Sequence, residues 1–60
     1  MFQYYVIADT VGEIGLTYYF GNSEAKAKKE ITRLQSLPTV VQIRYRNGKQ
    51  VQKIDGLAKN

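Results

Sequence analysis

Two stretches near the start of the chain, residues 2–8 and 14–20, consist mostly of apolar and aromatic residues with few polar positions. Both stretches are rich in aromatic and β-branched residues, which pack well on a pleated, half-buried surface. The short segment between them, 9–13, contains Gly12. The pattern therefore predicts two strands joined as a hairpin.

A loop centred on Val11 predicts how these two strands pair, because directly opposed residues share a face of the sheet. One face is then apolar throughout, with the pairs Phe2/Phe20, Tyr4/Tyr18, Val6/Leu16 and Ala8/Ile14. The other face carries Gln3/Tyr19, Tyr5/Thr17 and Ile7/Gly15. A slip of one residue would mix the two faces, so we expect this register.

A helix is predicted to follow, beginning at Ser23 or Asn22 as the N-cap. Glu24 in its first turn suits the positive end of the helix dipole. Pro38 disfavours helical geometry at the residue before it and so ends the helix. One narrow apolar stripe recurs at helical spacing, formed by Ala27, Ile31 and Leu34 and extended by Leu37.

Two more strands, 39–46 and 49–54, flank Asn47-Gly48, the strongest short signal for a tight hairpin. A two-residue turn there pairs Arg46 with Lys49 and sorts the remaining residues by alternation. The face toward the helix carries Thr39, Val41, Ile43, Tyr45 and Ile54. The opposite face carries Val40, Gln42, Arg44, Arg46, Lys49, Val51 and Lys53.

These elements predict one small α+β domain over residues 1–60, in the order β-β-α-β-β. The helix should cover one face of a four-stranded, mainly antiparallel sheet, and nothing in this chain is left to cover the other face. Residues 56–60 are expected to be a flexible tail. The predicted core is Phe2, Tyr4, Val6, Leu16, Tyr18, Phe20, Ile31, Leu34, Val41, Ile43 and Ile54.

Composition narrows the function classes. The chain has 60 residues and no Cys, His or Trp, so disulfides and ordinary zinc sites are excluded. A domain this small is marginally stable alone, which favours regular packing or oligomerisation. The N-terminus does not resemble a signal peptide, and no apolar run is long enough to span a membrane. We expect a cytoplasmic protein encoded by a complete small open reading frame.

The usual catalytic groups are missing as well. General acid–base catalysis mostly uses His or a carboxylate with a shifted pKa, and the carboxylates here are scattered. Neither Ser23 nor Ser36 has an evident base to activate it, and no glycine-rich loop joins a strand to a helix. We therefore expect a non-enzymatic protein with no cofactor and no metal.

Charge is unevenly distributed along the chain. Residues 1–22 contain two acidic residues and no Lys or Arg, whereas residues 23–60 contain all nine Lys and Arg. The net charge of +4 indicates an anionic partner for the second part, or serves only to keep a small protein soluble.

The uncovered sheet face is the first candidate binding surface. It is predicted to combine Tyr5 and Tyr19 with a basic strip of Arg44, Arg46, Lys49 and Lys53. Bases stack on aromatic rings while cations follow the phosphates, so this chemistry suits single-stranded nucleic acid. The layout resembles the open sheet of the RNA-recognition fold, although that family's motif is absent and its element order differs. The outer helix face is a second candidate phosphate contact, with Lys26, Lys29 and Arg33.

Two other interpretations of the open face remain. Tyr5, Ile7, Tyr19 and Val51 could contact a second copy, since a small chain without staples has reason to form a homodimer. The basic residues could instead be solvated and discourage edge aggregation. An alternative function is a protein-directed inhibitor or adaptor of the phage or mobile-element type, which would occupy an acidic protein surface.

The stretch Tyr18-Tyr19-Phe20-Gly21-Asn22-Ser23-Glu24-Ala25-Lys26 resembles the strand-to-helix passage in arm-binding domains of phage-type integrases. Those domains usually have three strands before the helix and no closing hairpin. This chain has two strands on each side of its predicted helix, so we carry no function over from that family.

Overall fold

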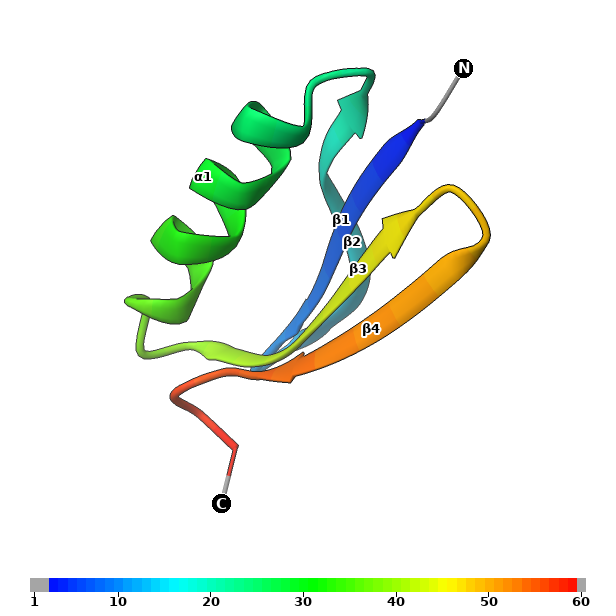
Figure 1. Ribbon diagram of the computed structural model, residues 1–60. Helices are drawn as coiled ribbons and strands as arrows, with labels where there is room; N and C mark the ends of the chain where they lie inside the picture. The colour runs from blue at the N-terminus through cyan, green and yellow to red at the C-terminus, as the bar shows by residue number, and fades with distance from the viewer. Residues whose placement is uncertain (1–2, 60) are drawn as a thin grey trace.

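The computed structural model describes residues 3–59 and confirms the predicted α+β fold in the order β-β-α-β-β. Its elements are β1 (Tyr4–Thr10), β2 (Glu13–Gly21), α1 (Glu24–Gln35), β3 (Val40–Asn47) and β4 (Gln50–Asp55). The strands form one four-stranded antiparallel sheet in the order β2-β1-β3-β4, and α1 lies against one face of it (Figure 1). We call the opposite face the open face, because no helix or strand among residues 3–59 covers it.

The start of α1 is fixed by two side chains. The Ser23 hydroxyl accepts a hydrogen bond from the Lys26 amide at 3.2 Å, as the predicted N-cap should. The Tyr19 hydroxyl accepts one from the Ser23 amide at 3.0 Å. To reach that amide the Tyr19 ring passes over Gly21, where a Cβ would lie 2.5 Å from the Tyr19 hydroxyl oxygen. A side chain at position 21 would therefore displace the Tyr19 hydroxyl from the Ser23 amide.

The core lies between α1 and the sheet. The predicted stripe of Ala27, Ile31 and Leu34 is buried, as expected for an amphipathic helix. The sheet contributes five more buried residues: Val6, Ala8, Val40, Ile43 and Tyr45. Partly buried residues surround this cluster, namely Tyr4, Tyr18, Tyr19, Leu37 and Ile54.

The predicted pairing of β1 with β2 is wrong. The strands begin at Thr10↔Glu13, but the register then shifts twice, so that Ala8 lies opposite Leu16 and Val6 lies opposite Tyr19. Each shift places an extra residue in β2, the first near Gly15, which has a φ of +78°, and the second at Tyr18. These are β-bulges, which re-aim the side chains that follow them.

The bulges change which β2 side chains face the helix. Tyr19, predicted on the open face, packs against the core, while Phe20, predicted in the core, lies opposite Tyr5 and is 54% exposed. Ile14, paired with Ala8 in the prediction, is 84% exposed. Leu16 is half-buried. The predicted core residue Phe2 lies outside the described residues.

The second hairpin also differs from the predicted pairing, by a shift of the turn. Asn47 pairs with Gln50, so the two turn residues are Gly48, with a φ of +59°, and Lys49. This shift keeps the predicted faces of Arg44, Arg46 and Ile43, because it moves the register by an even number of positions. Near the start of β3 a bulge changes the faces, so that Val40 is fully buried and Val41, predicted in the core, is half-buried.

The segment after β4, expected to be a flexible tail, has partners on β3. The Gly56 amide donates to the Val41 carbonyl and the Ala58 amide to the Val40 carbonyl, each at 2.8 Å. A Cβ on Gly56 would overlap the Val40 carbonyl oxygen. The described part of the tail thus follows β3 closely, and this course requires glycine at position 56.

Val40 and Ile14 test the corrected registers. Val40→Ala should lower the free energy of unfolding by about 2 kcal/mol, because it removes two buried methyl groups and leaves a cavity. Ile14→Ala should change it by less than about 0.5 kcal/mol, because that side chain is in solvent. Urea unfolding followed by circular dichroism measures both, and a larger loss for Ile14→Ala than for Val40→Ala would contradict the structure.

Tyr45 generates a second stability prediction. Its hydroxyl is buried without a hydrogen-bond partner among the described residues, and burial raises the pKa of Tyr45. Tyr45→Phe should therefore increase the free energy of unfolding by about 1 kcal/mol at neutral pH. Above about pH 10 the unfolded chain releases this proton more readily than the folded one, so native stability falls with rising pH.

The gain from Tyr45→Phe should accordingly grow at alkaline pH, which urea titrations of both proteins at neutral and alkaline pH would measure. A loss of stability in the Phe variant at neutral pH would mean that the hydroxyl has a partner.

Candidate binding surface

One row of side chains crosses all four strands on the open face. Tyr5 of β1 pairs with Phe20 of β2 on one side and with Arg46 of β3 on the other, and Arg46 pairs with Val51 of β4. The Tyr5 and Phe20 rings are stacked, with centroids 4.5 Å apart, and the Arg46 guanidinium carbon lies 5.9 Å from the Tyr5 centroid. We call Phe20, Tyr5 and Arg46 the aromatic row.

Within the aromatic row, Tyr5 lies between its two neighbours. Because β1 is flanked by β2 and β3, Phe20 approaches Tyr5 from one side and Arg46 from the other. Phe20 lies on an edge strand and is 54% exposed. The predicted combination of Tyr5 with Tyr19 is therefore corrected to Tyr5 with Phe20, and Phe20 offers the accessible ring.

A shallow pocket adjoins the aromatic row beside the β3–β4 turn. Its volume is about 240 Å³, and it is lined by Gln3, Tyr5, Arg46 and Gly48. The Gly48 amide donates to the Gln3 carbonyl at 3.2 Å, which holds the turn next to the start of β1. The Arg46 guanidinium and the Gln3 side chain bring hydrogen-bonding groups to this pocket.

The four basic residues predicted on this face are not equivalent. The Arg44 guanidinium donates a hydrogen bond to the Asp9 carboxylate at 2.8 Å. The same carboxylate oxygen accepts a hydrogen bond from the Gly15 amide at 2.9 Å. Asp9 therefore compensates the Arg44 charge. Lys53, opposite Arg44, and Lys49, in the turn, are exposed and form no ion pair within residues 3–59.

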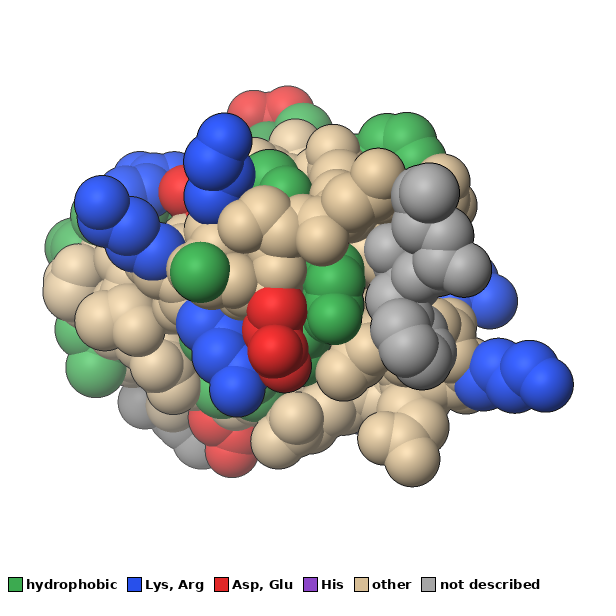
Figure 2. All heavy atoms as spheres, turned by 45° about the horizontal axis from the view of Figure 1, so that its top comes forward, with side chains coloured by type: hydrophobic (Ala, Val, Ile, Leu, Met, Phe, Trp, Pro, Cys, Tyr) green, Lys and Arg blue, Asp and Glu red, His purple; other side chains and the backbone are tan. Residues whose placement is uncertain are grey.

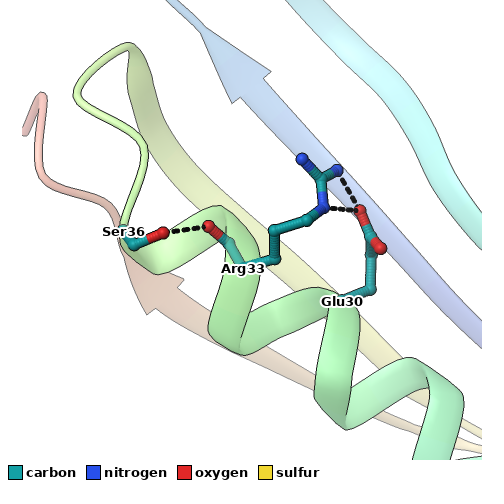
Figure 3. A network of polar contacts seen from close by, with 3 residues as sticks. All are labelled: Glu30, Arg33 and Ser36. Carbon is teal, nitrogen blue, oxygen red and sulfur yellow. Dashed lines mark hydrogen bonds and ion pairs between the residues drawn. The ribbon is translucent and has the colours of Figure 1, made fainter.

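The remaining predicted residues form a second group on the helix side. One shallow pocket of about 430 Å³ contains all of them and is lined by Tyr19, Lys26, Lys29, Glu30 and Arg33. Arg33 forms an ion pair with Glu30, and its Nε donates a hydrogen bond to the Glu30 carboxylate at 2.9 Å (Figure 3). The Arg33 backbone carbonyl accepts a hydrogen bond from the Ser36 hydroxyl at 2.7 Å. The hydrogen bond with Glu30 raises the pKa of Arg33. Of this group, Lys26 and Lys29 have no ion-pair partner in the described chain.

The predicted site is thus divided between two surfaces. On the face drawn in Figure 2, the basic side chains lie in separate places rather than in one continuous patch, with acidic side chains among them. The open face keeps Tyr5, Arg44, Arg46, Lys49 and Lys53, and the helix-side pocket holds the other four predicted residues.

Sequence reasoning missed Phe20, Gln3 and Asp9 as parts of the open-face site. Phe20 was assigned to the core because the predicted register contained no bulge. Gly15 was the available signal, since a glycine inside a strand often marks a bulge. Gln3 and Asp9 become relevant only when β1 is placed beside β3, a strand order that the sequence does not indicate.

Within residues 3–59, no cluster of three or more acidic, His or Cys side chains could hold a metal ion, and no helix has the length and apolar character to cross a membrane. The fold and the site define a class: a small α+β protein whose antiparallel sheet carries aromatic and basic side chains on its open face. Comparisons with known protein families, with curated proteins and with solved structures give no match.

Proposed function

We propose that this chain is a non-enzymatic basic binding protein that engages single-stranded nucleic acid, or a nucleoprotein, through the open face. The observation that supports this is the aromatic row, which lies beside two cations, Lys49 and Lys53, that form no ion pair within residues 3–59. Stacking surface next to mobile positive charge is what a flexible, anionic, base-bearing strand requires.

Base stacking would begin at Phe20. Its ring is exposed on the edge of the sheet and is supported from behind by Tyr5. Stacking on an aromatic side chain contributes about 1–3 kcal/mol per base and depends little on base identity. A neighbouring base can enter the pocket beside Tyr5, where Gln3 and Arg46 offer hydrogen-bonding groups.

Phosphates would lie on the β3–β4 hairpin. Arg46, Lys49 and Lys53 project from the open face or from the turn, and none of them has an acidic partner in the described chain. Arg44 would contribute less, because its charge is already compensated by Asp9. Phosphate contacts release counterions, so the affinity should fall steeply with salt.

Arg46→Glu combined with Lys53→Glu should weaken binding to a fluorescent single-stranded oligonucleotide by at least about tenfold, since two phosphate contacts are reversed in charge. Fluorescence anisotropy measures this at low and moderate salt, against single-stranded DNA, RNA and duplex DNA. Lys26→Glu combined with Lys29→Glu is the matched control, because it makes the same change in net charge on the helix side, at two exposed lysines that likewise form no ion pair within residues 3–59. Equal weakening by both double variants would show that only net charge matters.

Phe20→Ala separates stacking from charge in the same assay. It should weaken single-strand binding by about tenfold, whereas Ile14→Ala, which also truncates an exposed apolar side chain of β2, should not. If none of the three nucleic acids binds even at low salt, the proposal is wrong.

A second candidate is a protein-directed inhibitor or adaptor of the phage or mobile-element type. One observation favours it: Phe20 and Val51, on the open face, are 54% and 61% exposed and offer apolar surface to a protein partner. Immobilised protein incubated with a nuclease-treated bacterial lysate should then retain a stoichiometric partner, and Val51→Glu should release it. Retention that disappears with nuclease would instead favour nucleic acid.

A further inference from the structure

The two edges of the sheet differ in regularity. β2, at one edge, is interrupted by two bulges. β4, at the other edge, pairs with β3 from Gln50 to Asp55 without any register shift. Residues 50–53 of β4 are exposed. Bulges are a common protection against edge-to-edge pairing, and a regular edge presents a row of free backbone donors and acceptors.

We propose that β4 pairs with β4 of a second copy of this chain, antiparallel, with Gln52 of each copy on the two-fold axis. The two sheets then become one continuous sheet. The inference concerns how two copies assemble, and it holds whether or not the open face binds nucleic acid.

Alternation along the strand restricts the register. In an antiparallel pair, directly opposed residues must share a face, so the axis passes through a residue and not between two residues. Two such registers pair most of β4, one with Gln52 on the axis and one with Lys53 on the axis.

Charge decides between these two registers. With Lys53 on the axis, two ammonium groups are directly opposed, which is destabilising in a sheet. With Gln52 on the axis, two carboxamides face each other, and each can donate and accept a hydrogen bond. That register also brings Lys49 of each copy beside Asp55 of the other, where it adds a second cation to the exposed ion pair of Asp55 with Lys59. The lysines of the hairpin therefore select one register instead of preventing pairing.

The resulting dimer has a defined shape. A two-fold axis perpendicular to the sheet keeps both helices on one side and both open faces on the other. The two basic hairpins become neighbours at the centre of the joined open face. A chain of 60 residues would gain from such pairing, because it buries little surface alone.

The test uses the absence of cysteine from the chain. In Gln52→Cys the two thiols lie on the axis, where directly opposed Cα atoms are about 4.5–5.5 Å apart, a distance that a disulfide spans. Gln50→Cys is the matched control. Its two thiols, one from each copy, are offset along the paired strands by four residues, or about 13 Å. Both variants replace an exposed glutamine on the same face of β4.

Under a mild oxidant, Gln52→Cys should form covalent dimers at least about tenfold faster than Gln50→Cys, because the paired thiols have a high effective concentration. Non-reducing gels measure the rates, and sedimentation velocity across a concentration series measures the dimer of the unmodified chain. Equal rates for the two variants, a chain that stays monomeric at every concentration, or a dimer that Gln52→Cys does not trap would each overturn the inference.

Charge reversal tests the register independently. Lys49→Glu and Asp55→Lys should each weaken dimerisation by about tenfold, because two attractive contacts become repulsive. The double variant should restore it, and failure to restore it would contradict the register. Anisotropy with a single-stranded oligonucleotide, run on the unmodified chain, keeps the two proposals apart: binding without dimerisation rejects only this inference, and dimerisation without binding rejects only the proposed function.

Discussion

β1 is hydrogen-bonded along both of its edges, to β2 and to β3, and the other features of the protein depend on its regular alternation. Val6 and Ala8 point from it into the core, while Tyr5 lies on the open face beside Phe20 and Arg46. The extra residues that adjust the two neighbours to this central strand are placed in β2 and β3, not in β1. A slip of β1 by one residue would exchange the core and the binding surface.

The open face is electrostatically graded along the strands as a result. At the end near the β3–β4 turn, Arg46 and Lys49 have no acidic neighbour in the described chain. Toward the other end, Asp9 pairs with Arg44, and Asp55 pairs with Lys59 at 3.0 Å. An anionic ligand should therefore cross the face at the turn end, where the aromatic row and its pocket lie.

Local signals predicted the elements well, and the pairing of strands less well. The Ser23 cap and the helix stripe depend on neighbours within a turn or two, so they could be predicted from the sequence. In the second hairpin the observed pairing of β3 with β4 differs from the predicted one by an even number of positions. Arg44 and Arg46 therefore lie on the face that was predicted for them. The first hairpin contains two bulges in β2. The first could have been inferred from Gly15, but Tyr18, at the second, carries no such signal. Because the second bulge was not predicted, Tyr19 and Phe20 were assigned to the wrong faces of the sheet. Strand order, which places Asp9 next to Arg44, follows from tertiary packing that no local pattern indicates.

The most direct test of the central claim is a ¹H–¹⁵N NMR titration of the whole chain with a short single-stranded oligonucleotide. The account predicts chemical-shift changes concentrated at Phe20, Tyr5, Arg46 and the β3–β4 turn, with α1 largely unaffected. Changes confined to α1 and its pocket at Lys26 and Lys29 would contradict it. So would the absence of any change at an oligonucleotide concentration that saturates ordinary single-strand binders.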